Sequence, residues 1–218
     1  MTLEADTVVR PRTVRLRADA TRNRERIVSA AREAIVDYGP DVALDEVARR
    51  AGVGNATLYR HFADRTELIR QVTLSVMART AQRAEAALIE EPDAFSALCR
   101  FVFEAADERI GALCPMLSDA FDRQDPQVAA EVQRMEQAIN AIMDRAQCSG
   151  QLRGDIAVGD LMVALTQLTR PLPGTGCVGF DRFVRRHLQL FLDGLRAPAR
   201  SELVGTAATL EDLQGCHK

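Results

Sequence analysis

Residues 44–62 read LDEVARRAGVGNATLYRHF, and this stretch decides the fold of the N-terminal part of the chain. Its first eight residues form a short helical pattern that contains Ala48, whose small side chain allows a second helix to approach closely. Gly52 follows four residues later and suits a turn that needs a positive φ angle. In the second half, Leu58 and Phe62 supply an apolar side, whereas most other side chains are polar. Two short helices joined at a glycine turn predict a helix-turn-helix whose second helix faces the major groove of DNA.

Helical patterns flank this motif on both sides. Before it, residues 21–38 carry one apolar stripe at helical spacing, formed by Ile27, Ala31, Ala34, Ile35 and Tyr38. The dipeptide Gly39-Pro40 ends that helix. After the motif, Asp64 is followed three residues later by Glu67, which is a helix-start pattern. We predict that the helix starting there runs to about residue 89.

The remainder of the chain also has the pattern of helices separated by breakers. Pro92 fits the first turn of a further helix, and Asp125-Pro126 starts another. Segments 158–170 and 180–196 are again apolar at helical spacing, and the pattern fades after Pro198. We find no convincing strand pattern and no internal repeat, so the sequence predicts an all-α fold of about nine helices.

Charge is distributed unevenly along the 218 residues, whose net charge is −3. Residues 10–70 contain 13 Arg against nine Asp and Glu, so the rest of the chain is net negative. A net negative chain argues against a general nucleic-acid coat, whereas a basic N-terminal end suits local contact with DNA. Residues 1–18 include Arg10, Arg12, Arg15 and Arg17, which predict a flexible basic arm. The arm either adds phosphate or minor-groove contacts or is a leader without function.

Other classes of protein find little support in the sequence. No apolar run reaches the ~18 residues of a membrane helix, and the N-terminus lacks the apolar core of a signal peptide, so we expect a cytoplasmic protein. The cysteines are scattered at long intervals without a Cys-x-x-Cys pair, and only Cys216 has a neighbouring His, so the sequence predicts no metal site. They are Cys99, Cys114, Cys148, Cys177 and Cys216. None of His61, His187 and His217 sits beside an Asp/Ser or Cys set at helical spacing, so we expect no enzyme and no cofactor.

The longest recognisable pattern spans about residues 20–70, and its most specific part is GVGNATLYRHFADRTEL, residues 52–68. Here the chain resembles the tetracycline-repressor (TetR) family of transcription regulators. That family's pattern has Gly-Val, small or polar residues, Thr-Leu-Tyr, one variable residue, His and Phe. The sequence departs from it at Arg65, where Lys is more usual, and at Ala43, where a capping Thr is usual. The second departure puts the phosphate contact of that cap in doubt.

The resemblance implies DNA contacts at nine positions. Asn55 and Ala56 would approach the bases, and an exposed Asn can form two hydrogen bonds with adenine. Tyr59 and His61 would hold phosphates, and Arg65 would add another phosphate contact from the next helix. Phosphate contacts set the register, whereas base contacts set sequence preference. The full set is Leu44, Asp45, Gly54, Asn55, Ala56, Thr57, Tyr59, His61 and Arg65.

Two of these side chains also fit purely structural roles. The ring of Tyr59 would pack equally well against the preceding helix, and His61 would fit a hydrogen-bonded position in the core. Arg60 is expected to be solvated rather than specific for a base.

The resemblance also implies a helical domain that binds a small ligand and forms a dimer. Segments 158–170 and 180–196 would build a four-helix interface with a second copy, although intrachain core packing is the alternative for each residue. Pocket candidates are mostly apolar, which predicts an apolar or amphipathic ligand, and ordinary core packing is again the alternative. They are Phe95, Phe101, Val102, Met116, Phe121, Met135, Ile139, Met143 and Leu165.

These expectations divide the chain into four parts. Residues 1–18 form the arm, 19–70 the helix-turn-helix domain, 71–198 the ligand-binding and dimerisation domain, and 199–218 a flexible tail. The function expected is that of a homodimeric repressor, released from a palindromic, inverted-repeat operator in double-stranded DNA by a small-molecule effector. The alternative keeps the DNA binding but replaces the ligand with cysteine oxidation or a protein partner.

Overall fold

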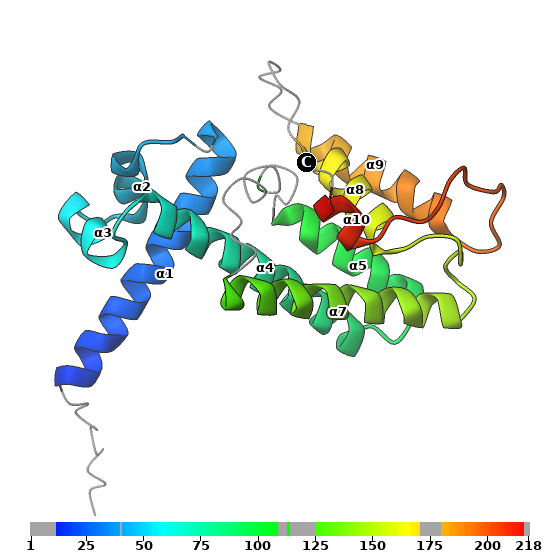
Figure 1. The fold of residues 1–218 in the computed structure, drawn as a ribbon, viewed down its shortest axis with the longest axis horizontal. Helices are drawn as coiled ribbons and strands as arrows, with labels where there is room; N and C mark the ends of the chain where they lie inside the picture. The colour runs from blue at the N-terminus through cyan, green and yellow to red at the C-terminus, as the bar shows by residue number, and fades with distance from the viewer. Residues whose placement is uncertain (1–11, 40, 109–112, 114–124, 171–179, 216–218) are drawn as a thin grey trace, which may run out of the picture. The chain divides into compact units, whose positions relative to one another are not determined.

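The computed structural model describes residues 12–39, 41–108, 113, 125–170 and 180–215. Apart from an isolated bridge between Leu152 and Arg196, the described residues contain helices and no strand. The prediction of an all-α fold is therefore confirmed (Figure 1). The described helices are α1 (Arg12–Tyr38), α2 (Leu44–Ala51), α3 (Asn55–His61), α4 (Arg65–Glu90), α5 (Ala94–Asp107), α7 (Pro126–Cys148), α8 (Val158–Thr169), α9 (Phe180–Leu195) and α10 (Leu210–Gly215).

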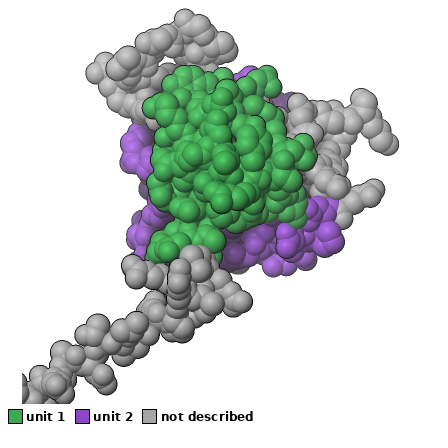
Figure 2. Space-filling model, turned by 90° about the vertical axis from the view of Figure 1, so that its left-hand side faces the viewer, with its two compact units in different colours: residues 1–72 green, residues 73–218 purple. Residues whose placement is uncertain are grey.

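The chain forms two compact units, residues 1–72 and residues 73–218, which Figure 2 shows in different colours. The boundary falls inside α4, so that helix begins in the first unit and ends in the second. No described helix combines the length and the apolar composition that crossing a membrane requires.

The core of the first unit follows the apolar stripe of α1. Ile27, Ala31 and Ala34 are fully buried, and Ile35 is 3% exposed. Tyr38, which was expected on the same stripe, is instead 62% exposed at the end of the helix. There its ring lies 5.4 Å from the guanidinium of Arg50.

Helix α1 begins at Arg12, so the predicted flexible arm is wrong over residues 12–18. Leu, Arg and Ala have high intrinsic helix propensity and are common in this segment, which extends the helix before its apolar stripe begins. Residues 1–11 lie outside the described part of the chain.

The core of the second unit lies among α5, α7, α8 and α9. Its fully buried side chains include Phe101, Ile139, Leu165 and Leu188, one from each helix. Asp125 caps α7 by accepting a hydrogen bond from the backbone N–H of Gln127 at 2.8 Å, which confirms the predicted helix start.

The start of α5 differs slightly from the prediction. Pro92 precedes the N-cap instead of lying in the first turn, because Asp93 supplies the cap. The carboxylate of Asp93 accepts hydrogen bonds from the Ser96 backbone N–H at 2.7 Å and from the Gln151 side chain at 2.7 Å. The Ser96 side chain, the Gln151 side chain and the Ser96 backbone N–H together lower the pKa of Asp93 to about 2, because hydrogen bonds favour the charged carboxylate.

The segment after α9 is not a flexible tail over its described residues, and that prediction is wrong for residues 199–215. Arg153, only 7% exposed, donates a hydrogen bond to the Ser201 carbonyl oxygen at 2.8 Å. Asp160 of α8 accepts one from the Ala208 backbone N–H at 3.2 Å. Leu210 is 8% exposed in the core of the second unit. We call residues 199–215 the C-terminal strap; residues 216–218 lie outside the described part.

The close contact between α8 and the C-terminal strap predicts a large effect of one methyl group. A Cβ atom at Gly159 would lie 2.6 Å from the carbonyl oxygen of Thr209 and would overlap the carbonyl group of Ala208. We expect Gly159→Ala to displace the strap and to lower the free energy of unfolding by about 1–3 kcal/mol, as overpacking does. Thermal unfolding followed by circular dichroism measures this. Gly154→Ala is the matched control, because a Cβ there meets nothing within 4 Å. Equal melting temperatures for both variants would contradict the contact.

Candidate DNA-binding site

A left-handed residue joins α2 to α3. Gly52 has φ 64° and ψ 37°, a conformation that disfavours other residue types. The backbone N–H of Val53 donates to the Ala48 carbonyl oxygen at 3.0 Å, which closes the turn. A Cβ atom at Gly52 would lie 2.8 Å from the guanidinium of Arg26. That guanidinium donates to the Ala51 carbonyl oxygen at 2.6 Å, so α1 holds the end of α2 in place.

Helix α3 has one buried side and one exposed side. Leu58 is 1% exposed and Phe62, its C-cap, is fully buried. On the other side, Asn55 and Ala56 are exposed, and Tyr59 is 52% exposed. A short helix anchored by two apolar residues thus presents its first turn and its tyrosine to solvent. Such an arrangement suits a helix that enters the major groove.

Hydrogen bonds within the motif orient its polar side chains. The Asn55 amide donates to the carboxylate of Asp45 at 2.7 Å. Arg60 donates to the Thr57 hydroxyl at 3.0 Å and to the Ala56 carbonyl oxygen at 3.1 Å. The predicted base reader Asn55 therefore lies beside a second predicted site residue, Asp45. Nothing in a ten-residue separation along the sequence indicates this pair.

Arg24 of α1 holds the C-terminal end of α3, and sequence reasoning missed it. Its guanidinium donates to the His61 carbonyl oxygen at 2.9 Å and lies 4.5 Å from the centre of the Phe62 ring. The same group lies 3.3 Å from the carboxylate of Glu67 at the start of α4. Arg24 thereby ties three helices together. The sequence signal was a polar residue beside the apolar stripe of α1, which alone does not separate a support from a solvated charge.

Arg65 lies in the first turn of α4 and already has an internal partner. Its guanidinium donates to the Val42 carbonyl oxygen at 2.5 Å, and the residue is half-buried. The preceding Asp64 accepts a hydrogen bond from the Glu67 backbone N–H at 2.8 Å, which confirms the predicted helix start. At the start of α2, Ala43 provides no side-chain cap.

The nine predicted DNA contacts all lie in the first unit, and most are accessible. Asp45, Gly54, Asn55, Ala56 and Tyr59 are exposed, whereas Leu44, Thr57, His61 and Arg65 are half-buried. Their roles at DNA stay predictions.

Ion pairs on α2 partly neutralise the charges near this surface. Arg49 donates two hydrogen bonds to Glu46 at 2.7 Å each, and this pairing lowers the pKa of the Glu46 carboxyl. Arg50 donates to Asp37 of α1 at 2.6 Å, which raises the pKa of that guanidinium.

The predicted pocket residues that the structure describes belong to the core of the second unit. Met135 is half-buried against that core, and six others are at most 3% exposed: Phe95, Phe101, Val102, Ile139, Met143 and Leu165. Met116 and Phe121 lie outside the described residues. Within the described ranges, no group of three His, Cys, Asp or Glu residues is placed to hold a metal ion. Two thiols are described there as free, Cys99 and Cys148.

Family models match both units of the chain. Residues 27–72 match the model described as bacterial regulatory proteins of the tetR family. Residues 92–197 match the C-terminal domain of SbtR-like transcriptional regulators. Helix α1 before residue 27 and the C-terminal strap lie outside these two matches.

Individual proteins are similar over most of the chain. The regulator NfxB of Pseudomonas aeruginosa is 29% identical over 81% of this chain and 96% of its own length. A solved TetR regulator from Streptomyces coelicolor is 29% identical, covers 81% of this chain and 99% of that chain, and has a TM-score of 0.61. The match to a Pseudomonas putida regulator is shorter, with 42% identity over 27% of this chain, and the chain spans 44% of the length of that regulator.

The repressor LfrR of Mycolicibacterium smegmatis is 30% identical over 57% of this chain and 65% of its own length. A solved structure of LfrR in complex with proflavine covers 84% of this chain and 99% of that chain, with 21% identity and a TM-score of 0.56, so it is similar in fold. Sequence models, relatives and folds agree. The chain belongs to the TetR family of helix-turn-helix transcription regulators.

Proposed function

We propose that the protein is a homodimeric repressor that binds an inverted-repeat operator through α3 and leaves it when an apolar or amphipathic small ligand binds the second unit. The observation that carries the DNA-binding part is the two-sided α3. The buried side chains of Leu58 and Phe62 anchor one side of α3 in the core. Asn55 and Tyr59 therefore project into solvent from a rigid support. Rigid support favours specific contacts because little side-chain and backbone freedom is lost on binding.

The contact roles follow from exposure and chemistry. Asn55 and Ala56 face the bases, where an amide can pair with adenine. Gly54 leaves the first backbone N–H groups of α3 free for a phosphate. Tyr59 meets a phosphate with its hydroxyl, since its ring is half exposed rather than packed in the core. The remaining members of the site are Leu44, Asp45, Thr57, His61 and Arg65.

The regulatory part of the proposal rests on the second unit. LfrR is a repressor by name and binds proflavine in its solved structure, which supports a small ligand for this chain as well. The apolar core of this chain's second unit favours an apolar or amphipathic effector. Control by thiol oxidation is disfavoured at Cys99, because burial raises the pKa of that thiol and so lowers its thiolate fraction.

Selection of random duplex DNA with the purified protein, followed by salt titration, tests the proposal. Enrichment of an inverted repeat is expected, because a two-fold dimer presents two copies of α3 to two half-sites. Salt-sensitive binding without enrichment would contradict sequence-specific recognition by α3.

Substitutions on α3 separate phosphate contacts from base contacts. Tyr59→Ala is expected to weaken binding about tenfold on every sequence, because it removes a hydrogen bond to a charged group. Asn55→Ala is expected to relax the preference at one base pair of each half-site. Fluorescence anisotropy on the selected operator and on single-base variants measures both effects.

Tyr38→Ala is the matched control, because Tyr38 is also an exposed tyrosine of the first unit but lies at the end of α1. Its affinity for the operator should equal that of the wild type. Uniform loss on all sequences for Asn55→Ala would show that Asn55 does not read a base.

A further inference from the structure

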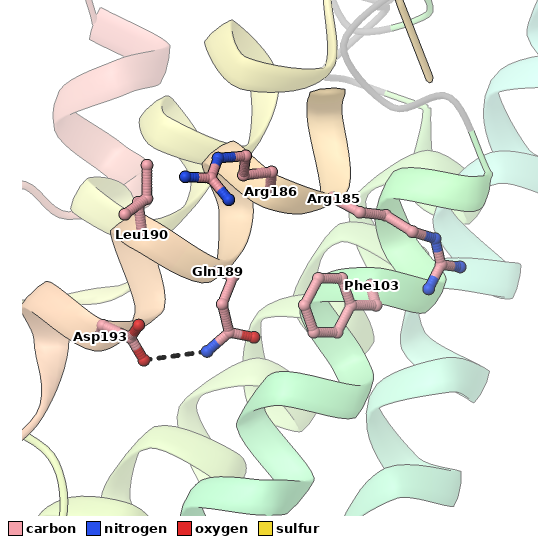
Figure 3. Close-up of a pocket in the computed structure, with 6 residues that line it drawn as sticks. All are labelled: Phe103, Arg185, Arg186, Gln189, Leu190 and Asp193. Atoms are coloured by element: carbon pink, nitrogen blue, oxygen red, sulfur yellow. Dashed lines mark hydrogen bonds between the residues drawn. The ribbon is translucent and has the colours of Figure 1, made fainter. Parts of the chain in front are cut away.

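A groove of about 510 Å³ runs along α9 where it lies beside α5. Phe103 of α5 lines one side of it, and Arg186, Gln189 and Asp193 of α9 line the other, with the Arg186 guanidinium pointing away from the Phe103 ring (Figure 3). The Gln189 amide donates to the Asp193 carboxylate at 2.9 Å. Arg185 projects to the other end of the groove, where it pairs with Asp107 at 2.7 Å.

The outer face of α9 carries apolar and charged side chains at helical spacing. Phe183 is 46% exposed and Leu190 is 60% exposed, and Arg186 and Asp193 are also exposed. We call these four residues the α9 outer face. They recur at intervals of three or four residues, so they lie on one side of the helix, opposite the buried Leu188 and Leu192. Large apolar side chains exposed on a regular face indicate an interaction surface.

The charges of this face are complementary to the same face turned through 180°. Arg186 and Asp193 lie on either side of Leu190, at similar distances along the helix. If two copies of α9 packed antiparallel around a two-fold axis near Leu190, each Arg186 would face the Asp193 of the other copy. Two such ion pairs would lie about 10 Å apart at 1.5 Å rise per residue. A two-fold interface needs this self-complementarity, because the same surface serves on both sides.

Two further observations favour a second copy as the occupant. A Cβ atom at Gly194 would meet nothing within 4 Å, so the helix surface leaves room for close approach beside Asp193. Within the part of the chain that the structure describes, Arg186 has no hydrogen bond or ion pair, unlike Arg185. A guanidinium from the partner that entered the groove would meet both the Asp193 carboxylate and the Phe103 ring, which attract it by charge and by cation–π interaction.

We infer that the α9 outer face docks on the same face of a second copy, in antiparallel register, with Leu190 near the axis and reciprocal Arg186–Asp193 ion pairs that select the partner. This inference rests on the proposed homodimer and adds its register and its specificity. Opposite charges across an interface suppress wrong pairings, because like charges brought together cost several kcal/mol.

A charge exchange between two variants tests the register. In homodimers of Arg186→Asp, two pairs of carboxylates would meet, and in homodimers of Asp193→Arg, two pairs of guanidinium groups would meet. We expect each variant alone to dissociate at least about tenfold more readily than the wild type. An equimolar mixture should form heterodimers within about threefold of the wild-type dissociation constant, because both ion pairs are restored, one with the wild-type polarity and one reversed. Light scattering after size exclusion and pull-down of differently tagged chains measure this.

Arg185→Asp is the matched control. It makes the same charge change one residue away, on the side of α9 that faces Asp107. Mixed with Asp193→Arg, it should give no preference for heterodimers. Circular dichroism spectra identical to that of the wild type exclude misfolding as the cause.

The possible outcomes separate the inference from the function on which it rests. If the wild-type protein is monomeric at micromolar concentration, the proposed homodimer and the inferred register are both wrong. A stable wild-type dimer whose single variants dissociate no more readily, or whose mixture shows no heterodimer preference, overturns the register alone. Preferential heterodimers in the Arg186→Asp and Asp193→Arg mixture, without them in the control mixture, support it.

Discussion

Phe62→Ala is expected to unfold the first unit and to abolish operator binding, while the second unit stays folded. Phe62 is fully buried, and its ring lies under the Arg24 guanidinium that also holds the end of α3. Truncation removes the ring and leaves a cavity, which costs about 3–5 kcal/mol. This cost is a large fraction of the free energy of unfolding of a small domain, since whole domains are stable by about 5–15 kcal/mol. The second unit has its own core and loses no contact of this ring.

Hydrogen exchange read by mass spectrometry resolves this prediction by segment. Amides of α1, α2 and α3 should exchange much faster in Phe62→Ala, whereas those of α5, α7 and α8 should be unchanged. Tyr59→Ala is the control within the same helix: it should keep the exchange pattern of the wild type and lose affinity only. Preserved protection of α3 in Phe62→Ala would mean that Phe62 does not anchor the recognition helix.

Arg79→Met is expected to destabilise the second unit by about 2–3 kcal/mol. Arg79 donates two hydrogen bonds to Glu108, at 2.8 and 2.5 Å, and Glu108 is only 8% exposed. Removal of one partner of a buried ion pair leaves an uncompensated charge and costs about 3–5 kcal/mol. The expected cost is lower here because Arg83 remains 3.4 Å from the same carboxylate.

The reverse truncation should cost less, which gives the prediction its control. Glu108→Gln leaves the Arg79 guanidinium behind, but the side chain of Arg79 is 43% exposed and can be hydrated. We expect about 1 kcal/mol or less for this variant, near the value of ordinary surface pairs. Urea unfolding curves give both values from the midpoints at constant slope. Equal losses for the two variants would contradict the description of Glu108 as the buried member.

The sequence predicted the elements that local patterns specify. Helices α2 and α3, the Gly52 turn and the Asp64 and Asp125 caps agree with the prediction, because cap and turn residues act within a few positions of the chain. The predicted apolar stripe of α1 is buried at its aliphatic residues but not at Tyr38. The spacing of apolar residues does not indicate where a helix extends beyond the core.

What the sequence did not predict depends on residues far apart in the chain. The C-terminal strap lacks a long apolar period of its own, and it is ordered by the buried Arg153, by Asp160 and by the absence of a Cβ atom at Gly159. The Arg24 support and the Asn55–Asp45 pair likewise join different helices. Such contacts form only once the helices are packed, so no local pattern indicates them.

In the proposed complex with DNA, the hydrogen bond between Asn55 and Asp45 limits the free energy that a base read by Asn55 can contribute. One N–H of the amide already donates to a charged acceptor at 2.7 Å before DNA arrives. In the proposed complex, exchange of one partner for another yields only the difference between two hydrogen bonds, which is smaller than the full value of either. In that complex, the smaller gain would shorten residence on a matched site. A base that Asn55 reads as proposed would have to be a better partner for this N–H than Asp45.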